Sequence, residues 1–108
     1  MVRTAALALV LAAACNRPVA GGSTDGAKVF AAACARCHGD TGKPPKQMID
    51  QLGVRDLTGD EWKARRTREV VEHQVRAGST NGRMPAFTGA LTEAQIQAVA
   101  AYVMTLGQ

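Results

Sequence analysis

The stretch AAACARCHGDTGK, residues 31 to 43, brings two cysteines and a histidine together as Cys34, Cys37 and His38. Closely spaced cysteines occur in redox-active dithiols, in metal sites and in proteins that hold a haem covalently. Each of these chemistries makes a different demand on the rest of the chain. The surrounding sequence therefore decides which of the three applies.

The spacing itself has a geometric meaning. Two cysteines three positions apart on a helix lie on the same side of it, so both sulfurs reach one flat group. Thioether bonds to the two vinyl groups of a haem, with the following histidine on the iron, are the attachment used by c-type haems. The order Cys34, Cys37, His38 predicts this attachment.

The alternatives fit the sequence less well. A thioredoxin-like dithiol begins a helix after a strand, whereas Cys34 and Cys37 lie late in a predicted helix and no strand is evident. A structural zinc site needs a fourth ligand, usually from a second Cys or His pair, and only Cys15 and His73 remain. A disulfide between Cys34 and Cys37 leaves His38 unexplained. Haem attachment is therefore preferred.

The composition also favours a chain that folds around a large apolar group. The 108 residues suffice for one small domain, and such domains often need a disulfide, a metal or a cofactor for stability. Hydrophobic residues make up 46% of the chain, but many are alanines, and aromatics supply only 4%. The formal net charge of +4 includes no long run of like charge, so nothing indicates nucleic-acid binding.

The N-terminus is predicted to be an export signal. Residues 1–14 carry one arginine and then an apolar run of roughly ten residues, too short for a permanent membrane span. Cys15 follows small residues, as in the lipobox of bacterial lipoproteins, although Ala12 stands where that motif usually has leucine. We expect lipidation of Cys15; ordinary cleavage nearby, leaving a free thiol, is the alternative. Residues 15–24 then form a flexible tether.

Residues 25–108 are predicted to form one all-α domain. Asp25 is the expected N-cap of a helix over about 26–37. A second helix is expected over 46–52, and a third follows a capping box at Thr58–Glu61. A fourth is expected from Thr67 to Gly78. The last begins after a capping box at Thr92–Gln95 and ends at Gly107. The inward residues of the last two helices are predicted to be Val70, Val71 and Val75, and Ile96, Val99, Ala100, Val103 and Leu106.

Four pieces of the chain now carry a family resemblance: GAKVFAAACARCH, RDLTGDEW, GRMPAF and LTEAQIQAVAAYV. From about Asp25 to Leu106 the sequence resembles the bacterial class I cytochromes c. The resemblance implies a small cytochrome c fold, three to five helices wrapped around one covalent haem c. It implies electron transfer by Fe(III)/Fe(II) cycling, with no enzymatic activity.

The resemblance also implies the axial ligands of the iron, His38 and Met84. Met84 lies in a loop far enough along the chain to reach the face opposite His38. Among the other candidates, Met48 follows His38 too closely, and Met104 is expected to pack in the core. His73 lies on the polar side of its helix and is expected to be exposed.

Other positions take supporting roles by the same resemblance. A proline carbonyl, from Pro44 or Pro45, is expected to orient the His38 ring. Arg55 and Trp62 are candidates for hydrogen bonds to a haem propionate. The expected crossing of the first and last helices involves Gly26, Phe30, Val99 and Tyr102.

Basic side chains are candidates for a collar that steers acidic redox partners. They are Lys43, Lys46, Lys63, Arg65, Arg66, Arg68, Arg76 and Arg83. Solvated helix faces explain most of them equally well, and Lys43 and Arg83 are preferred because each lies near a predicted ligand.

The resulting prediction is a monomeric electron carrier on the periplasmic side of a bacterial membrane, tethered by lipid on Cys15. It would shuttle single electrons between redox partners with acidic docking surfaces. One alternative is a haem-bearing subunit of a larger oxidoreductase complex. Another is a haem enzyme or gas sensor, which requires an exchangeable sixth ligand in place of Met84.

Overall fold

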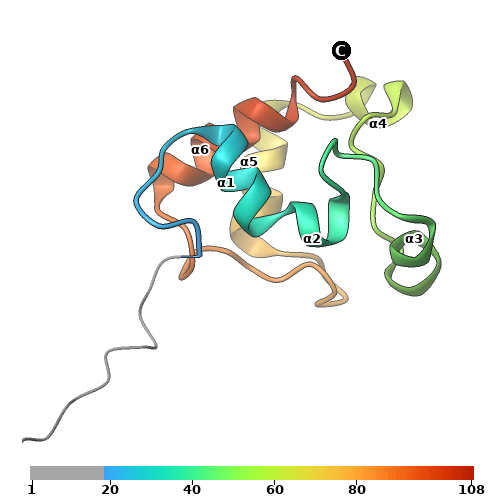
Figure 1. Ribbon diagram of the computed structural model, residues 1–108, viewed down its shortest axis with the longest axis horizontal. Coiled ribbons are helices and arrows are strands. Elements are labelled where there is room, and N and C mark those ends of the chain that lie inside the picture. The colour runs from blue at the N-terminus through green and yellow to red at the C-terminus, as the bar shows by residue number, and fades with distance from the viewer. Residues whose placement is uncertain (1–18) are drawn as a thin grey trace, which may run out of the picture.

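The computed structural model describes residues 19–108, and the predicted signal peptide and Cys15 lie outside this range (Figure 1). Within these residues the chain forms helices and loops and no strand, which confirms the predicted all-α fold. The elements in chain order are α1 (Gly26–Ala33), α2 (Ala35–His38), α3 (Lys46–Leu52), α4 (Asp60–Ala64), α5 (Arg68–Ala77) and α6 (Glu93–Val103). None of these helices is long and apolar enough to cross a membrane.

The predicted helix over 26–37 is interrupted at Cys34. This residue has φ −120° and ψ −35°, outside helical geometry, although its N–H still donates to the carbonyl of Phe30. A short new helix, α2, begins beyond it, with the His38 N–H bonded to the Cys34 carbonyl over 3.0 Å. The apolar spacing continues across the break, so sequence periodicity alone could not detect it.

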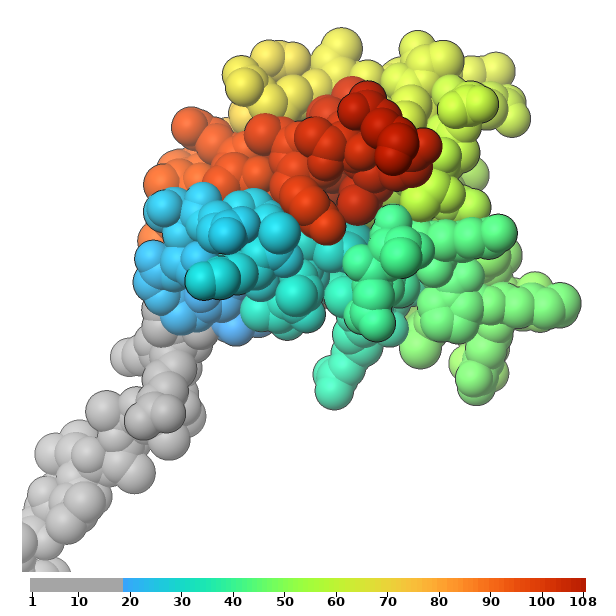
Figure 2. Space-filling view, turned by 45° about the horizontal axis from the view of Figure 1, so that its top comes forward, coloured from blue at the N-terminus to red at the C-terminus, as the bar shows by residue number. Residues whose placement is uncertain are grey.

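The crossing of α1 and α6 organises the domain. The two helices lie side by side on one face of the molecule (Figure 2). A Cβ on Gly26 would lie 2.3 Å from the carbonyl oxygen of Ala98, so only glycine permits this approach. The rings of Phe30 and Tyr102 contact each other with centroids 5.5 Å apart. Val99 is fully buried at the same crossing, which confirms the predicted contact.

The core is built mainly from α1, α5 and α6. Its buried residues are Val29, Phe30, Leu57, Val71, Val75, Leu91, Ile96, Val99, Ala100, Val103 and Leu106. Val71 and Val75 face inward as predicted, but Val70 is 47% exposed, contrary to expectation. Adjacent helical residues point about 100° apart, so Val70 cannot share the face of Val71 and Val75.

Side-chain N-caps begin three of the six helices described, α1, α5 and α6. Asp25 accepts from the Ala27 N–H and Thr67 from the Val70 N–H, both as predicted. The reciprocal capping box of Thr92 and Gln95 is also confirmed. The capping box predicted at Thr58 is wrong, because α4 begins after Gly59.

The Thr58 hydroxyl has a different partner, Asp56, and donates to its Oδ1 over 2.6 Å. The last helix also ends earlier than the predicted boundary at Gly107. Helix α6 ends at Val103, and Leu106 reaches the core from the turns that follow.

Gln95 ties the N-terminal segment to α6. Its side-chain Nε2 donates to the carbonyl oxygens of Gly21, over 3.0 Å, and Ser23, over 2.9 Å. Gln95 is 1% exposed, and Ala20 also packs against the core. The described end of the predicted tether is thus held against the domain. It lies at the end of the molecule opposite α3 and α4 (Figure 1).

Candidate haem site

Cys34 lies at the α1–α2 break and Cys37 lies within α2, and the two form no disulfide. Both are half-buried, and Cys34 packs against the core cluster. Burial raises the pKa of the Cys34 thiol to about 11, and the neighbouring Cys37 adds to this rise. Thiol–disulfide exchange uses a thiolate with a lowered pKa, so the site does not resemble a redox-active dithiol.

His38, at the end of α2, is held by a backbone group. Its Nδ1 lies 3.0 Å from the carbonyl oxygen of Arg55 and donates a hydrogen bond to it. The prediction that Pro44 or Pro45 would supply this carbonyl is wrong. The N–H of Leu57 donates to the carbonyl of Gly42, which brings the segment after α3 alongside the loop after α2.

This hydrogen bond fixes the state of the imidazole. With the proton on Nδ1, the other ring nitrogen, Nε2, keeps a free lone pair for a metal. Burial lowers the pKa of His38, while the bond to the Arg55 carbonyl opposes that shift. The ring is therefore neutral at neutral pH, the form in which histidine binds iron.

Met84 lies in the loop between α5 and α6. Its N–H donates to the Ser79 Oγ over 2.9 Å, and the Ser79 N–H donates to the Met84 carbonyl over 2.9 Å. The Met84 side chain is half-buried and packs against the core, as does Phe87. A Cβ on Gly78 would lie 2.6 Å from the Met84 carbonyl oxygen, so the loop folds closely onto the end of α5.

The other ligand candidates occupy ordinary positions. Met104 follows α6 and packs against the core, as expected. His73 is exposed on α5, also as expected. Met48 is half-buried on α3.

Arg55 and Trp62 line the same pocket, of about 410 Å³. The other lining residues are Asp56, Gly59, Glu61, Arg65 and Arg66. Arg65 pairs with Glu61, with Nη2 and Oε1 3.4 Å apart. Hydrogen bonds from the Thr58 side chain and N–H lower the pKa of Asp56. The pocket combines arginine donors with an indole, a surface suited to a carboxylate on an apolar group.

These donors fit a haem. The described residues include two thiols, an imidazole nitrogen left free by the Arg55 carbonyl, a loop thioether and an arginine-lined pocket, and each of these groups would have a partner on a haem. Within residues 19–108, by contrast, no three His, Cys, Asp or Glu side chains are grouped to hold a metal ion. The zinc alternative therefore has no ligand set in this range.

Within residues 19–108, some residues of the predicted basic collar form ion pairs and others do not. Lys46, Arg65, Arg68 and Arg76 pair with acidic side chains, several within one helix. Lys43, Lys63, Arg66 and Arg83 have no ion pair to an acidic side chain in the part of the chain described, and of these four Lys43 and Arg83 are exposed. A Cβ on Gly53 would lie 4.0 Å from an Nη1 of Arg83, so the Met84 loop approaches the end of α3.

Two features of the site were missed at the sequence level. The Arg55 carbonyl is a backbone group, which leaves no side-chain pattern to detect. Ser79 holds the Met84 backbone from five positions away, and the only signal for it was the polar stretch GSTNG.

Comparison with known proteins identifies the family and the fold. The family model described as cytochrome c oxidase, cbb3-type, subunit III matches residues 22–103. The solved KustC0563 c-type cytochrome has 30% sequence identity and a TM-score of 0.67, covering 74% of this chain and 94% of its own. The fold is thus that of a small c-type cytochrome.

Relatives of two kinds are similar in sequence. Cytochrome c6 of a Synechococcus species is 38% identical over 87 residues, 74% of this chain and 66% of the relative. Cytochrome c6 of Parathermosynechococcus lividus is 36% identical, over 74% of this chain and 85% of the relative. The cbb3-type cytochrome c oxidase subunit FixP of Azorhizobium caulinodans is 38% identical over 76% of this chain, which spans only 26% of FixP.

The chain therefore belongs to the cytochrome c family. Membership implies one covalently bound haem c, and the chemistry of the chain is electron transfer by that haem.

Proposed function

We propose that Cys34 and Cys37 hold the haem by thioether bonds and that His38 and Met84 are the axial ligands of its iron. The observation that carries this proposal is the hydrogen bond from His38 Nδ1 to the Arg55 carbonyl, beside two unpaired thiols. When bound, the haem exchanges one electron at a time between Fe(II) and Fe(III).

The protein residues set how that exchange proceeds. The Arg55 carbonyl holds the proton of the neutral His38 ring on Nδ1, which leaves Nε2 as the nitrogen with the free lone pair. Met84, held by Ser79, supplies a thioether, which favours reduced iron and raises the reduction potential. With both axial positions filled, no site remains for a substrate, so the chain acts as an electron carrier and has no enzymatic activity.

Arg55 and Trp62 are proposed to bind a haem propionate. Their side chains border one pocket, and the charge of Arg65 in that pocket is partly matched by Glu61. A propionate there would accept hydrogen bonds from the Arg55 guanidinium and the Trp62 indole N–H.

The cellular setting is the second part of the proposal. Residues 1–14 direct export, Cys15 is lipidated, and the domain of residues 25–108 works as a monomer on the periplasmic side of a bacterial membrane. Lys43 and Arg83, which are exposed and near the two axial ligands in sequence, would meet acidic surfaces on redox partners. Similarity to cytochromes c6 supports a mobile carrier.

A second candidate function uses the same chemistry in a fixed assembly. The matching family model and the relative FixP are both named as subunits of a cbb3-type cytochrome c oxidase. The alternative is therefore a haem-bearing subunit of a larger complex. Co-purification of stoichiometric partners in mild detergent would favour the subunit. Isolation as a single polypeptide would favour the carrier.

The decisive experiment is the denatured intact mass of the protein purified from membranes of its native host. Haem mass that survives denaturation in the wild type and is lost in a Cys34→Ala, Cys37→Ala variant supports the attachment. Acyl mass on a chain beginning at Cys15 supports the anchor. Absence of bound haem, with the maturation system intact, would refute the site.

The sixth ligand is tested by Met84→Leu, with Met48→Leu as the matched control. We expect only Met84→Leu to abolish the charge-transfer band of thioether-ligated ferric haem and to permit rapid binding of carbon monoxide to the reduced protein. Rapid carbon monoxide binding by the wild type would instead favour an exchangeable ligand, as in a gas sensor.

A further inference from the structure

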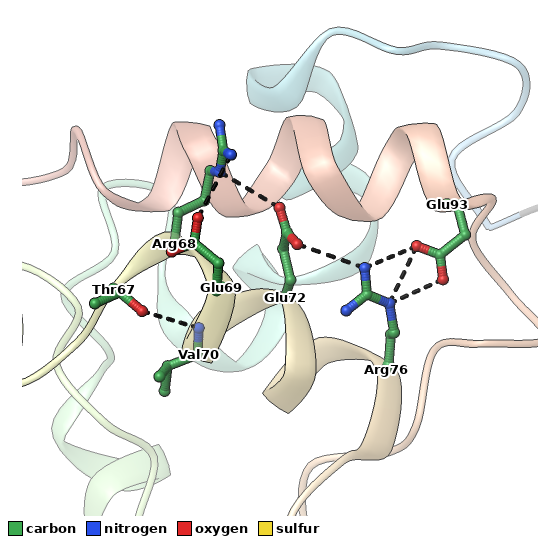
Figure 3. Close-up of polar contacts among 7 residues, drawn as sticks. All are labelled: Thr67, Arg68, Glu69, Val70, Glu72, Arg76 and Glu93. Atoms are coloured by element: carbon green, nitrogen blue, oxygen red, sulfur yellow. Dashed lines mark hydrogen bonds and ion pairs between the residues drawn. The ribbon is translucent and has the colours of Figure 1, made fainter.

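An ion-pair network joins α5 to α6 (Figure 3). Arg76 Nε donates to both Glu93 carboxylate oxygens, over 2.8 Å and 3.1 Å, and Nη2 donates to Oε2 over 2.9 Å. Nη2 also lies 3.5 Å from Glu72 Oε2, in a side chain only 12% exposed. Such multidentate arginine pairs have a defined geometry that single surface contacts lack.

The place of this pair in the chain gives it a further role. Arg76 lies in the last turn of α5, and Glu93 is the first residue of α6. The segment between the two helices, residues 78–92, is the loop that contains Met84. The side-chain pair therefore joins the two ends of that loop.

Backbone contacts close the same loop from within. The Thr88 hydroxyl donates to the Arg76 carbonyl over 2.8 Å, and the Phe87 N–H donates to the Val75 carbonyl over 2.9 Å. Fixing the ends of a loop restricts the conformations open to every residue between them. Arg76 thus constrains Met84 without being one of the residues that hydrogen-bond to it.

We propose that the Arg76–Glu93 pair is a positioning pair for Met84, keeping its thioether on the iron by closing the base of the 78–92 loop. This inference rests on Met84 being the sixth ligand, as proposed above. When the pair is broken, the loop opens more often, Met84 leaves the iron more often, and external ligands gain access. Strong salt acts in the same direction because the pair is solvent-accessible.

The test compares holoprotein variants by the rate at which cyanide binds to the ferric form, a rate limited by Met84 release. Arg76→Gln and Glu93→Gln are expected to raise this rate about fivefold. The exchanged double variant, Arg76→Glu with Glu93→Arg, is expected to restore part of the wild-type rate. Addition of salt should accelerate the wild type more than Arg76→Gln.

Two matched controls separate positioning from other effects. Arg68→Gln removes a cation from the same helix, but one whose partners, Glu69 and Glu72, lie on that helix too. Thr67→Ala removes the N-cap at the far end of α5 and is expected to lower the denaturation midpoint, as loss of such a cap usually does. Neither is expected to change the cyanide rate.

The outcomes distinguish this inference from the proposed ligation. If the wild type lacks the thioether band, or if Met84→Leu binds cyanide no faster than the wild type, the sixth ligand is wrong and the inference falls with it. If the band is present but Arg76→Gln matches the wild type, only the positioning role is overturned. A rate increase of equal size in Thr67→Ala would also overturn it, since the cause would be global stability.

Discussion

His38 and Arg55 are joined by a hydrogen bond of 3.0 Å between an imidazole Nδ1 and a backbone carbonyl. One residue at position 55 thereby has two separable roles. Its carbonyl orients the histidine, and its side chain lines the pocket shared with Trp62. A side-chain substitution at this position can alter the second role while leaving the first intact.

Arg55→Gln is therefore expected to keep the absorption spectrum of the His38-ligated haem and to lower the reduction potential. Loss of a positive charge beside a propionate favours the Fe(III) state, by about 20–60 mV if the interaction is worth about 0.5–1.4 kcal/mol. Potentiometric titration measures the shift. Arg65→Gln is the control, because that arginine lines the same pocket but pairs with Glu61. An equal drop in both variants would argue against a specific contact at Arg55.

Gly26→Ala is expected to destabilise the domain by about 2 kcal/mol or more, because the new Cβ would lie 2.3 Å from the Ala98 carbonyl oxygen and 2.8 Å from the Tyr102 Cβ. Helices α1 and α6 would have to separate. Denaturant unfolding of the haem-loaded protein measures the loss. Gly89→Ala, where a Cβ meets nothing within 4 Å, should unfold like the wild type. Equal stability of Gly26→Ala and the wild type would contradict the close crossing.

Gln95→Ala is expected to cost about 1–3 kcal/mol of unfolding free energy. The substitution removes a buried side-chain amide, so the Thr92 N–H and the Gly21 and Ser23 carbonyls lose their hydrogen-bond partner. It should also increase proteolytic cleavage between residues 19 and 25. Gln97→Ala on the same helix is the control, since that side chain is exposed. Unchanged cleavage in the Gln95 variant would show that the N-terminal segment is held by other contacts.

Thr58→Val tests the hydrogen bonds to Asp56. Bonds from Thr58 lower the pKa of this carboxyl in the folded protein. The resulting stability is present above the ordinary pKa of an aspartate and is lost as pH falls through the lower folded value. Thr58→Val should therefore be less stable than the wild type at neutral pH, by a few tenths to about 1 kcal/mol given the partial exposure.

The Thr58→Val difference should shrink as pH falls below the ordinary pKa of an aspartate, as followed by denaturant unfolding. The same substitution in an Asp56→Asn background should lose this pH dependence. A difference that stays constant with pH would assign the effect to packing of the threonine methyl group.

Local chemistry made part of this fold predictable. Asp25, Thr67 and Thr92 cap helices because each side chain reaches an N–H two or three residues ahead, a distance set by the backbone alone. Thr58 does not cap α4 because that helix begins after Gly59, and its hydroxyl instead donates to Asp56 Oδ1. The sequence around Thr58 is compatible with a helix cap and with a hydrogen bond to Asp56, and it does not indicate which of the two forms.

Long-range contacts account for the remaining differences. The Arg55 carbonyl lies beside His38 in a fold where the segment before α4 pairs with the loop after α2, a contact between parts of the chain that are distant in sequence. Arg76 was predicted as part of a docking collar, but Glu93 lies across from it on α6. Both outcomes depend on how helices pack, and neither has a periodic signal in the sequence.

The Gln95 contact with Gly21 and Ser23 sets how far the domain could travel from a membrane. If Cys15 is acylated, only residues 15–20 remain between the lipid and the first carbonyl held by Gln95, a contour length of at most about 20 Å. The domain would be confined to a shallow layer beside the membrane. The chain leaves the domain at the end opposite α3 and α4 (Figure 1), so the Arg55 pocket lies far from the point of attachment. Encounters with other membrane proteins would then occur by lateral diffusion in two dimensions, at an effective concentration set by membrane crowding.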